Sequence, residues 1–371
     1  MVLDKTTHAA QIMQDFALRT GLIGKSEPKR YLWTDAFAVC NFLGLYESQK
    51  DIRYLDLARK LVDQVHNTLG RRHPDDKKQG WLSGLPDNIA QKHPTIAGLR
   101  IGKPLPERRE DEPYDEQLEW DRDGQYFHYL TKWMHALNRM TEMTGEYHYN
   151  IWAIELAKVA FAKFSYIESN SKERLMFWKM STDLNRPLIS SMGQHDPLDG
   201  WITYLKLQHV GKQNPNYNEN MDLHEEIAAL RRMTEYTTLV TADALGIGGL
   251  LNDTWFLAQL PSPDHAMLET LMVASVQSME IYVRQDKSIT LPAKHRLAFR
   301  ELGLAIGLEA VAKLDKLAEP FVRYQPIGEE IVSFWSEDAH QQNHTWQEHI
   351  DINTVMLATA LAPDGYLGGR T

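Results

Sequence analysis

The chain has 371 residues, of which 43% are hydrophobic and 24% charged, a composition typical of globular proteins. Its formal net charge of −10 argues against nucleic acid or an anionic membrane as a partner, because both carry negative charge themselves. The single cysteine, Cys40, excludes an intrachain disulfide and a cysteine-based zinc cluster.

The stretch MVLDKTTHAAQIMQDF at the start of the sequence lacks the apolar core of a signal peptide. No run of about 18 apolar residues, the length that a membrane-spanning helix needs, occurs further along. From these two features we expect a cytoplasmic protein.

Helical patterns of two kinds alternate along the chain. One kind has apolar residues on one face and charged residues on the other, which is typical of a helix half in water. The other kind is apolar on most faces and rich in aromatic and small residues, which is typical of a buried helix. In chain order, the amphipathic segments are 3–21, 51–68, 147–168, 219–236, 262–284 and 307–321, and the buried segments are 33–48, 124–143, 197–208, 242–258, 294–307 and 345–361.

This alternation repeats every roughly 50–70 residues. Helix pairs of this kind cannot bury their apolar faces alone and must pack with their neighbours around a common centre. No strand-like alternation competes with it over more than a few residues. The sequence therefore predicts an all-α chain that forms one domain over residues 1–371.

Two long segments interrupt the helical rhythm. Residues 70–122 are rich in proline and charge, and a connection of this length in a compact domain is usually a lid or a binding loop. Residues 170–196 form a second long loop, but their methionine and aromatic side chains indicate that this loop packs against something. We expect the first segment to be a lid-like insertion.

The alternation of six buried and six amphipathic helices resembles the six-hairpin, or (α/α)6-toroid, enzymes, which include glycoside hydrolases, unsaturated uronyl hydrolases and sugar 2-epimerases. RYLWTDAF at residues 30–37 looks like the opening of the first inner helix in several of these families, and SSMGQHDPLDGW at residues 190–201 reads like a family signature. The resemblance implies an (α/α)6 toroid of six inner and six outer helices, with its active site where the inner helices begin.

Carboxylates at those helix starts are the first candidates for catalysis. Sugar hydrolysis uses two carboxyl groups, one as acid and one as base. Acidic residues also cap helix N-termini, but Asp199 is harder to explain in this way, because Asp196 and Pro197 already supply the cap and the first helical residue. The predicted catalytic residues are Asp35, Asp123, Asp199 and Glu348.

Aromatic, imidazole and amide side chains at the same helix starts suit the binding of sugar faces and hydroxyl groups. The predicted substrate-binding residues are Trp33, Gln125, Tyr126, His128, His195, Asp196, Trp201, His344, Trp346 and His349.

Three functions remain open at this stage. The first is a glycoside hydrolase that uses a carboxylate pair. The second is a sugar epimerase, isomerase or lyase that uses two of the four histidines His128, His195, His344 and His349 as acid and base. The third is a non-catalytic binding protein built on the same helices.

The expected ligand is a small carbohydrate, with neither a cofactor nor a metal. No glycine-rich phosphate-binding motif is present, and His224-Glu225-Glu226 is followed by Ala228 where a zinc-binding helix would need a second histidine. Association into a homo-oligomer stays open.

Overall fold

The structure is a computed structural model that describes residues 4–169, 171, 173–285 and 288–368. Contacts within the chain define two compact units. We call Glu27–Val39 and Asp56–Thr237 the α6 unit, and Met1–Ser26, Cys40–Leu55 and Thr238–Thr371 the α12 unit.

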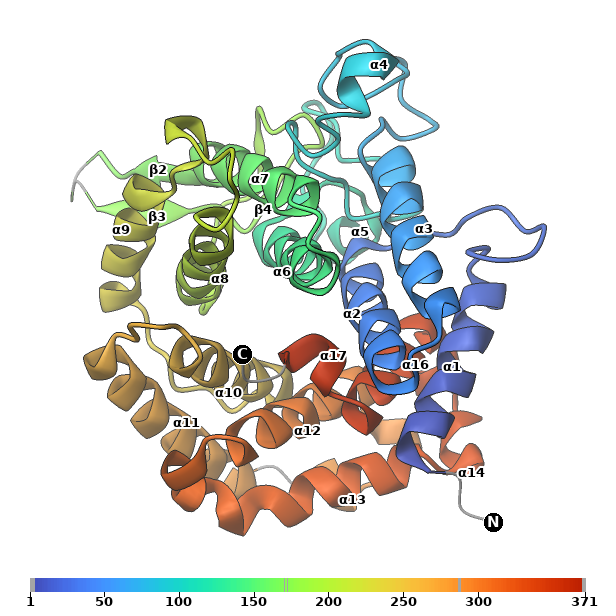
Figure 1. The fold of residues 1–371 in the computed structure, drawn as a ribbon, viewed down its shortest axis with the longest axis vertical. Coiled ribbons are helices and arrows are strands. Elements are labelled where there is room, and N and C mark those ends of the chain that lie inside the picture. The colour runs from blue at the N-terminus through green and yellow to red at the C-terminus, as the bar shows by residue number, and fades with distance from the viewer. Residues whose placement is uncertain (1–3, 170, 172, 286–287, 369–371) are drawn as a thin grey trace. The chain divides into compact units, whose positions relative to one another are not determined.

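The α6 unit contains four helices that pack in succession. α6 packs on α7 and on α8, and α8 packs on α9 (Figure 1). Their bounds are Phe127–Thr144 for α6, His148–Phe164 for α7, Asp196–Gly211 for α8 and His224–Met233 for α9, with 3-10 turns at Glu219–Met221 and Thr234–Tyr236.

Local sequence explains how α8 starts and how closely it approaches α6. Pro197 stands in the first turn, where its missing N–H costs nothing. Gly200 lies against the ring of Phe127, and a Cβ atom there would come within 2.9 Å of two ring carbons. The absence of a side chain at Gly200 therefore lets the first turns of α6 and α8 meet.

Short strands and helices connect these elements. β1 pairs antiparallel with β4, and β4 with β5, while β2 pairs with β3. The elements are α4 at Asp87–Ala90, α5 at Glu116–Asp121, β1 at Gln125–Tyr126, β2 at Ser165–Ile167, β3 at Arg174–Met176, β4 at Lys179–Met180 and β5 at Pro187–Ile189. The predicted loop 170–196, of which residues 170 and 172 lie outside the described part, thus contains three strands.

The α12 unit is built around α10 and α12. A Cβ atom at Gly248 of α10 would lie 2.1 Å from the carbonyl oxygen of Gly303 in α12, so the two helix backbones are in direct contact. α12 also packs on α13 and α16, and α16 on α1. The bounds are Lys5–Arg19 for α1, Ala244–Ala258 for α10, His265–Gln285 for α11, Ala298–Ala312 for α12, Gln325–Trp335 for α13, Asp338–Gln341 for α14, His344–Gln347 for α15, Ile350–Leu361 for α16 and Asp364–Leu367 for α17, with 3-10 segments at Ser288–Thr290, Ala293–His295 and Asp315–Tyr324.

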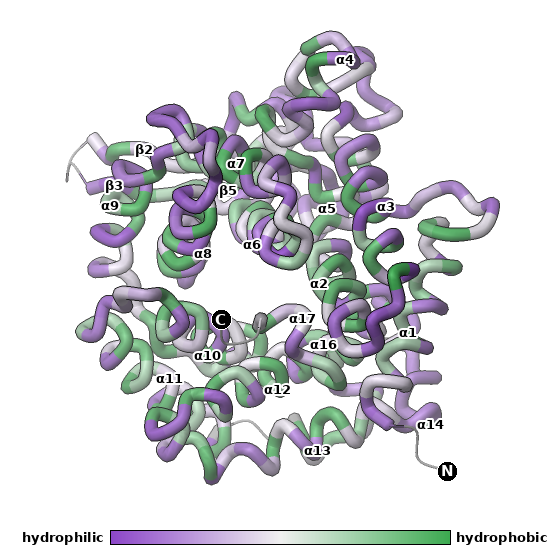
Figure 2. Tube along the Cα trace, in the orientation of Figure 1, coloured by the Kyte–Doolittle hydropathy of each residue, from purple (hydrophilic) through white to green (hydrophobic). Residues whose placement is uncertain are grey.

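Two helices have residues in both units. α2 spans Leu32–Gln49 and α3 spans Ile52–Leu69. In Figure 2 the tube is mainly green through α2 and α12, whereas purple and green alternate along α3 and α11. This contrast matches the predicted division into buried and amphipathic helices.

One predicted helix, 307–321, is wrong. α12 ends at Ala312, and Asp315, which follows, has a positive φ of 51° that is incompatible with an α-helix over this stretch. A 3-10 segment that contains Pro320 follows, and the next α-helix is α13, with Pro326 in its first turn. Pro320 keeps this 3-10 segment from forming an α-helix, because proline disrupts a helix interior, and Pro326 suits the first turn of α13.

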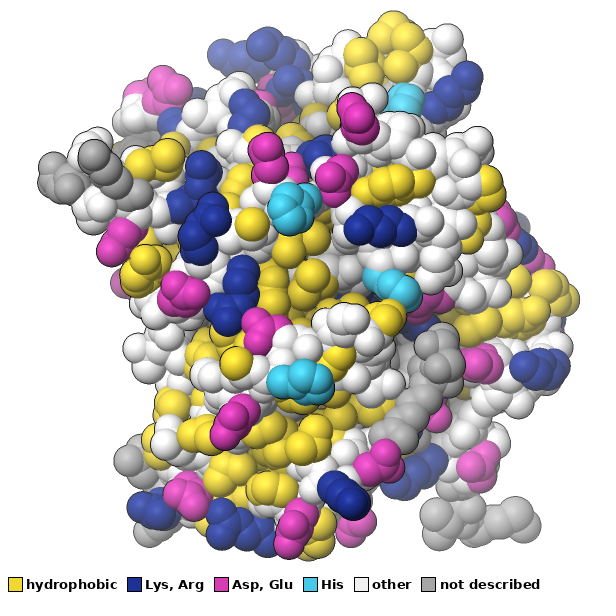
Figure 3. Space-filling view, turned by 60° about the vertical axis from the view of Figure 1, so that its left-hand side comes forward, with side chains coloured by type: hydrophobic (Ala, Val, Ile, Leu, Met, Phe, Trp, Pro, Cys, Tyr) yellow, Lys and Arg dark blue, Asp and Glu magenta, His cyan; other side chains and the backbone are white. Residues whose placement is uncertain are grey.

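Two further features are the apolar character of the helices and the distribution of charged side chains. Within the described ranges, no helix combines the length and the apolar character that a membrane crossing requires. On the face drawn in Figure 3, Lys and Arg side chains lie among Asp and Glu side chains.

Candidate active site

Asp196, the first residue of α8, is a buried carboxyl group that lacks a full set of partners. The residue is 6% exposed, and its Oδ2 atom has no hydrogen-bond partner among the described residues. Its carboxyl group folds back over Gly193, where a Cβ atom would lie 2.4 Å from Oδ2. Gly193 of the SSMGQHDPLDGW motif thus makes room for this carboxyl group.

Asp199, one turn further along α8, is paired with α6. Its Oδ1 atom lies 2.7 Å from Nζ of Lys132, and its Oδ2 atom accepts a hydrogen bond from the Thr131 hydroxyl. Burial and the negative charge of Asp199 together raise the pKa of Asp196 to about 7, while Lys132 opposes this shift. Asp196 is therefore about half protonated at pH 7 and mostly protonated below it.

His128, in the first turn of α6, faces Asp196. Its Nδ1 atom lies 4.0 Å from Oδ1 of Asp196, which is too far for a direct hydrogen bond, and it has no hydrogen-bond partner within the part of the chain that the structure describes. Burial lowers the pKa of His128 to about 4, although the charge of Asp199 works in the opposite direction. The imidazole is therefore neutral at neutral pH.

Aromatic rings surround this acid–imidazole pair. The ring of Tyr126 lies 5.3 Å from that of His128 and 5.7 Å from that of Trp178, and Trp178 stacks on His128 at 6.2 Å. The Tyr126 hydroxyl is the third buried polar atom here for which residues 4–169, 171, 173–285 and 288–368 supply no hydrogen-bond partner. Buried polar groups are almost always satisfied in folded proteins, so three together indicate a place for a ligand or water.

Tyr129 and Tyr31 extend the ring cluster. Their hydroxyl oxygens lie 2.7 Å apart, and Tyr129 makes an edge contact with His128 at 4.8 Å. Burial raises the pKa of Tyr31 to about 12. Both phenols are therefore protonated at neutral pH, and they can act as hydrogen-bond donors but not as bases.

The polar groups of three predicted residues of the same unit already have partners within the protein. Asp35 accepts the N–H of Tyr31 at 2.9 Å and lies 3.4 Å from Arg30. Asp123 forms a buried ion pair with Arg100. The amide of Gln125 accepts from one backbone N–H and donates to two carbonyl groups. These three side chains hold the start of α2 and the segment before α6 in place.

The remaining predicted residues of the α6 unit differ in exposure. The indoles of Trp33 and Trp201 are 5% and 4% exposed, so neither presents a face to solvent. The Trp201 ring carries the guanidinium of Arg231 at 5.3 Å. His195 is half-buried at the N-cap of α8, where its carbonyl oxygen accepts the N–H of Asp199 at 2.9 Å.

Four predicted residues lie in the α12 unit. His344 is exposed and lies 3.3 Å from Glu348, which is exposed as well. Trp346 is 1% exposed and stacks on Trp335. His349, also exposed, is the N-cap residue of α16, with its ring 6.1 Å from Phe299.

The candidate residues described above do not belong to a group of side chains that could hold a metal ion. Within the described ranges, no three His, Cys, Asp or Glu side chains come together in a way that could hold a metal ion.

Sequence reasoning missed Lys132, Tyr129 and Trp178. Lys132 had a usable signal, since it lies four residues after His128 and so on the same face of a buried helix, where a charge needs a partner. Trp178 had none, because it directly precedes β4, a strand of two residues that is too short to show a periodic pattern.

No protein-family model matches this chain, and no curated protein sequence matches it. Solved structures do. A GH76 α-mannanase of Bacteroides thetaiotaomicron superposes with a TM-score of 0.60 at 11% identity, over 98% of this chain and 96% of that chain.

Two further solved structures give a similar result. One is an inactive variant of a GH76 α-1,6-mannanase of a Salegentibacter species, with two aspartates replaced by alanine and α-1,6-mannotetrose bound. It has a TM-score of 0.58 at 12% identity and covers 97% of this chain and 99% of that chain. The other is a sugar epimerase from a ruminal bacterium, with a TM-score of 0.53 at 10% identity over 96% of this chain and 98% of that chain.

These enzymes share the (α/α)6-toroid fold, and the likeness extends over nearly the whole chain. This protein therefore has the fold of the six-hairpin, (α/α)6-toroid superfamily, and the predicted fold class is confirmed. Sequence identities of 10–12% show the fold alone.

Proposed function

We propose that the protein is a carbohydrate-active enzyme that cleaves a glycosidic bond, with Asp196 as the proton donor. One observation carries this proposal: a buried carboxyl group with a pKa of about 7 and an unpartnered oxygen faces a neutral imidazole beside aromatic rings. Similar folds among enzymes whose names state action on mannans and sugars support it.

The proposed roles follow from the two different environments on α8. Asp196 donates its proton to the departing sugar oxygen, and the charge of Asp199 keeps that proton in place until the sugar binds. Residues three apart on a helix have Cβ atoms about 5–6 Å apart. The Asp199 carboxylate is thus close enough to stabilise positive charge that develops on the sugar ring.

His128 completes the proposed acid–base set. The 4.0 Å between its Nδ1 atom and Oδ1 of Asp196 leaves room for one bridging oxygen of a water molecule or a sugar hydroxyl. A neutral imidazole can accept a hydrogen bond from such a group and so position it. Tyr126 and Trp178 supply the ring faces against which a sugar packs.

No catalytic role is assigned to three of the predicted carboxylates, Asp35, Asp123 and Glu348. The first two carboxylates are held by arginines inside the α6 unit, and Glu348 pairs with His344 at the surface of the α12 unit.

The test is Asp196→Asn, assayed on two aryl glycosides of one sugar, one with a poor and one with a good leaving group. Loss of a general acid slows cleavage by about 10²- to 10⁴-fold, and we expect this loss only with the poor leaving group, because a good one departs without a proton. The wild-type kcat/KM should also fall above about pH 7, and this fall should disappear in the variant.

Asp56→Asn, at an exposed carboxylate on α3, is the matched control and should leave both rates unchanged. Equal loss of rate on both substrates would remove Asp196 from the acid role. Binding of sugars without turnover by the wild type would favour a non-catalytic binding protein.

A second candidate, a sugar epimerase, isomerase or lyase, is favoured by His128. Its neutral imidazole opposite a protonated carboxyl group is also a base–acid pair for removing a proton from carbon beside a carbonyl group. Incubation of reducing sugars in deuterated water, followed by NMR, separates the two reactions. Deuterium at the sugar C2 without cleavage would indicate this second function.

A further inference from the structure

Trp120, on the short helix α5, is an exposed indole next to the site described above. It is 49% exposed, and its ring meets that of Trp178 edge to face at 5.6 Å and 84°. Trp178 in turn contacts both Tyr126 and His128. A continuous series of aromatic rings therefore leads from the surface at Trp120 to the unpartnered atoms around Asp196.

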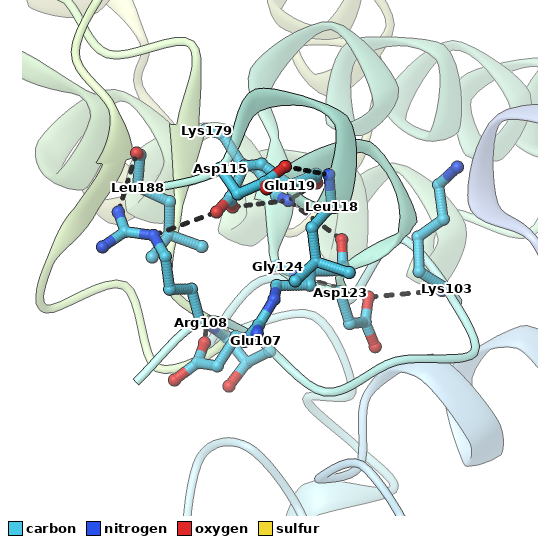
Figure 4. A network of polar contacts seen from close by, with 12 residues as sticks. Lys103, Glu107, Arg108, Asp115, Leu118, Glu119, Asp123, Gly124, Lys179 and Leu188 are labelled. Atoms are coloured by element: carbon cyan, nitrogen blue, oxygen red, sulfur yellow. Dashed lines mark hydrogen bonds and ion pairs between the residues drawn. The ribbon is translucent and has the colours of Figure 1, made fainter. Parts of the chain in front are cut away.

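A buried ion pair fixes the two indoles side by side. Lys179 directly follows Trp178, and Glu119 directly precedes Trp120. Nζ of Lys179 lies 2.9 Å from Oε1 of Glu119, and the two residues are 0% and 1% exposed (Figure 4). Because breaking a buried pair of this kind is costly, the backbone positions of Trp120 and Trp178 are coupled tightly.

Further contacts hold α5 in place. Arg108 donates from Nε to Oε2 of Glu119 at 3.0 Å and from Nη2 to the Leu188 carbonyl at 3.2 Å. Asp115 caps the helix by accepting the N–H of Leu118 at 2.9 Å, as Figure 4 also shows. The predicted lid-like insertion is thus anchored at its end near α6, and the exposed indole sits on a preorganised support.

Lys179 of this ion pair also contacts Tyr126, one of the rings beside Asp196. Nζ of Lys179 lies 5.4 Å from the centre of the Tyr126 ring, and Tyr126 pairs with Lys179 across β1 and β4. An exposed aromatic face that is rigidly held and continuous with a binding site is suited to a flat apolar ligand surface such as a sugar face.

We propose that Trp120 and Trp178 form an additional sugar-binding subsite, so that the ligand of the Asp196 site is an oligosaccharide chain and not a single sugar or a disaccharide. This inference rests on the proposed function. Units of the chain beyond those at Asp196 pack on the Trp178 and Trp120 rings, and the outermost unit covers the exposed face of Trp120.

The test measures binding against chain length in the Asp196→Asn background, so that no turnover interferes. α-1,6-Manno-oligosaccharides and cello-oligosaccharides of two to six units are titrated by calorimetry. We expect affinity to rise with length in the parent, and Trp120→Ala to weaken binding of the longer chains about tenfold, which corresponds to about 1.4 kcal/mol. Disaccharide binding should stay the same, and Trp120→Phe should retain most of the gain.

Tyr236→Ala, which removes an exposed aromatic ring elsewhere in the α6 unit, is the matched control and should change nothing. Equal affinity for all lengths, or the same loss at every length in Trp120→Ala, would overturn the subsite while leaving the proposed function intact. Binding of neither series at any length would overturn both. Length-dependent binding without cleavage by the wild type would overturn only the proposed cleavage.

Discussion

Two buried carboxyl groups, Asp196 in the α6 unit and Glu301 in the α12 unit, have opposite surroundings. Glu301 receives hydrogen bonds from the Arg296 guanidinium at 2.7–3.0 Å and from the Trp335 indole at 2.7 Å. The guanidinium also lies 3.8 Å from the centre of the Phe334 ring. In the part of the chain that the structure describes, Asp196 has no cation within ion-pair distance, and the imidazole of His128, 4.0 Å away, is neutral.

The difference shows that burial of a charge does not by itself mark a functional site. Glu301 is buried because its partners satisfy it, which is a structural arrangement. Asp196 is buried with one oxygen unsatisfied, and its pKa rises accordingly. A count of hydrogen-bond partners separates the two cases where burial alone does not.

The largest expected effect comes from breaking the satisfied pair. Glu301→Ala leaves the buried Arg296 without its carboxylate, and we expect it to lower the free energy of unfolding by about 3–5 kcal/mol. Chemical denaturation measures this loss. Glu280→Ala removes an exposed ion pair with Arg323 in the same unit and should cost less than about 1 kcal/mol. Equal losses in the two variants would contradict the comparison.

Asp196→Asn should remove a pH dependence of stability that the wild type has. The raised pKa means that the native carboxyl group keeps its proton longer than the unfolded one, so its contribution to stability is full below about pH 4 and is lost as the pH rises to about 7. The wild type should therefore lose about 1.4 kcal/mol per pH unit relative to the variant across this range. Denaturation curves at several pH values measure the difference, and parallel pH profiles would show that Asp196 titrates normally.

A smaller effect is expected from Gly193→Ala. The new Cβ atom would lie 2.4–2.5 Å from the carboxyl atoms of Asp196, so the carboxyl group must move. We expect kcat/KM for glycoside cleavage to fall about tenfold, because small misplacements of a reacting group are costly. The control is Gly249→Ala, where nothing lies within 4 Å of the added atom. An unchanged rate in Gly193→Ala would mean that the position of Asp196 is not critical.

The alternation of helices was predictable because a period of 3.6 residues is visible in the sequence itself. The same reasoning placed a helix over 307–321, where α12 ends at Ala312 and a 3-10 segment follows, since apolar periodicity continues through that segment. Strands of two and three residues, such as β4 and β5, were not predictable, because they are too short to show alternation.

The candidate site was predictable only in part. Tyr126, His128, Asp196 and Asp199 were identified because they stand where buried helices begin. Their partners were not predictable: sequence reasoning identified Asp199 as a catalytic residue and Asp196 as a substrate-binding residue, but not what either side chain contacts. In the structure Asp199 pairs with Lys132, and Asp196 is the carboxyl group with an unpartnered oxygen.

The sequence by itself determined a mainly helical chain in which buried and amphipathic helices alternate, because amphipathic periodicity and composition are local properties that a single chain displays; the toroid was implied only by the resemblance to six-hairpin enzymes. The tertiary structure alone decided which carboxyl group lacks a partner for one oxygen and which indoles meet. Those outcomes depend on burial and on partners distant in sequence, such as Lys132 for Asp199 and Trp178 for Trp120. Desolvation and pairing act between residues that are close in space but distant in the chain, so no sequence pattern predicts them.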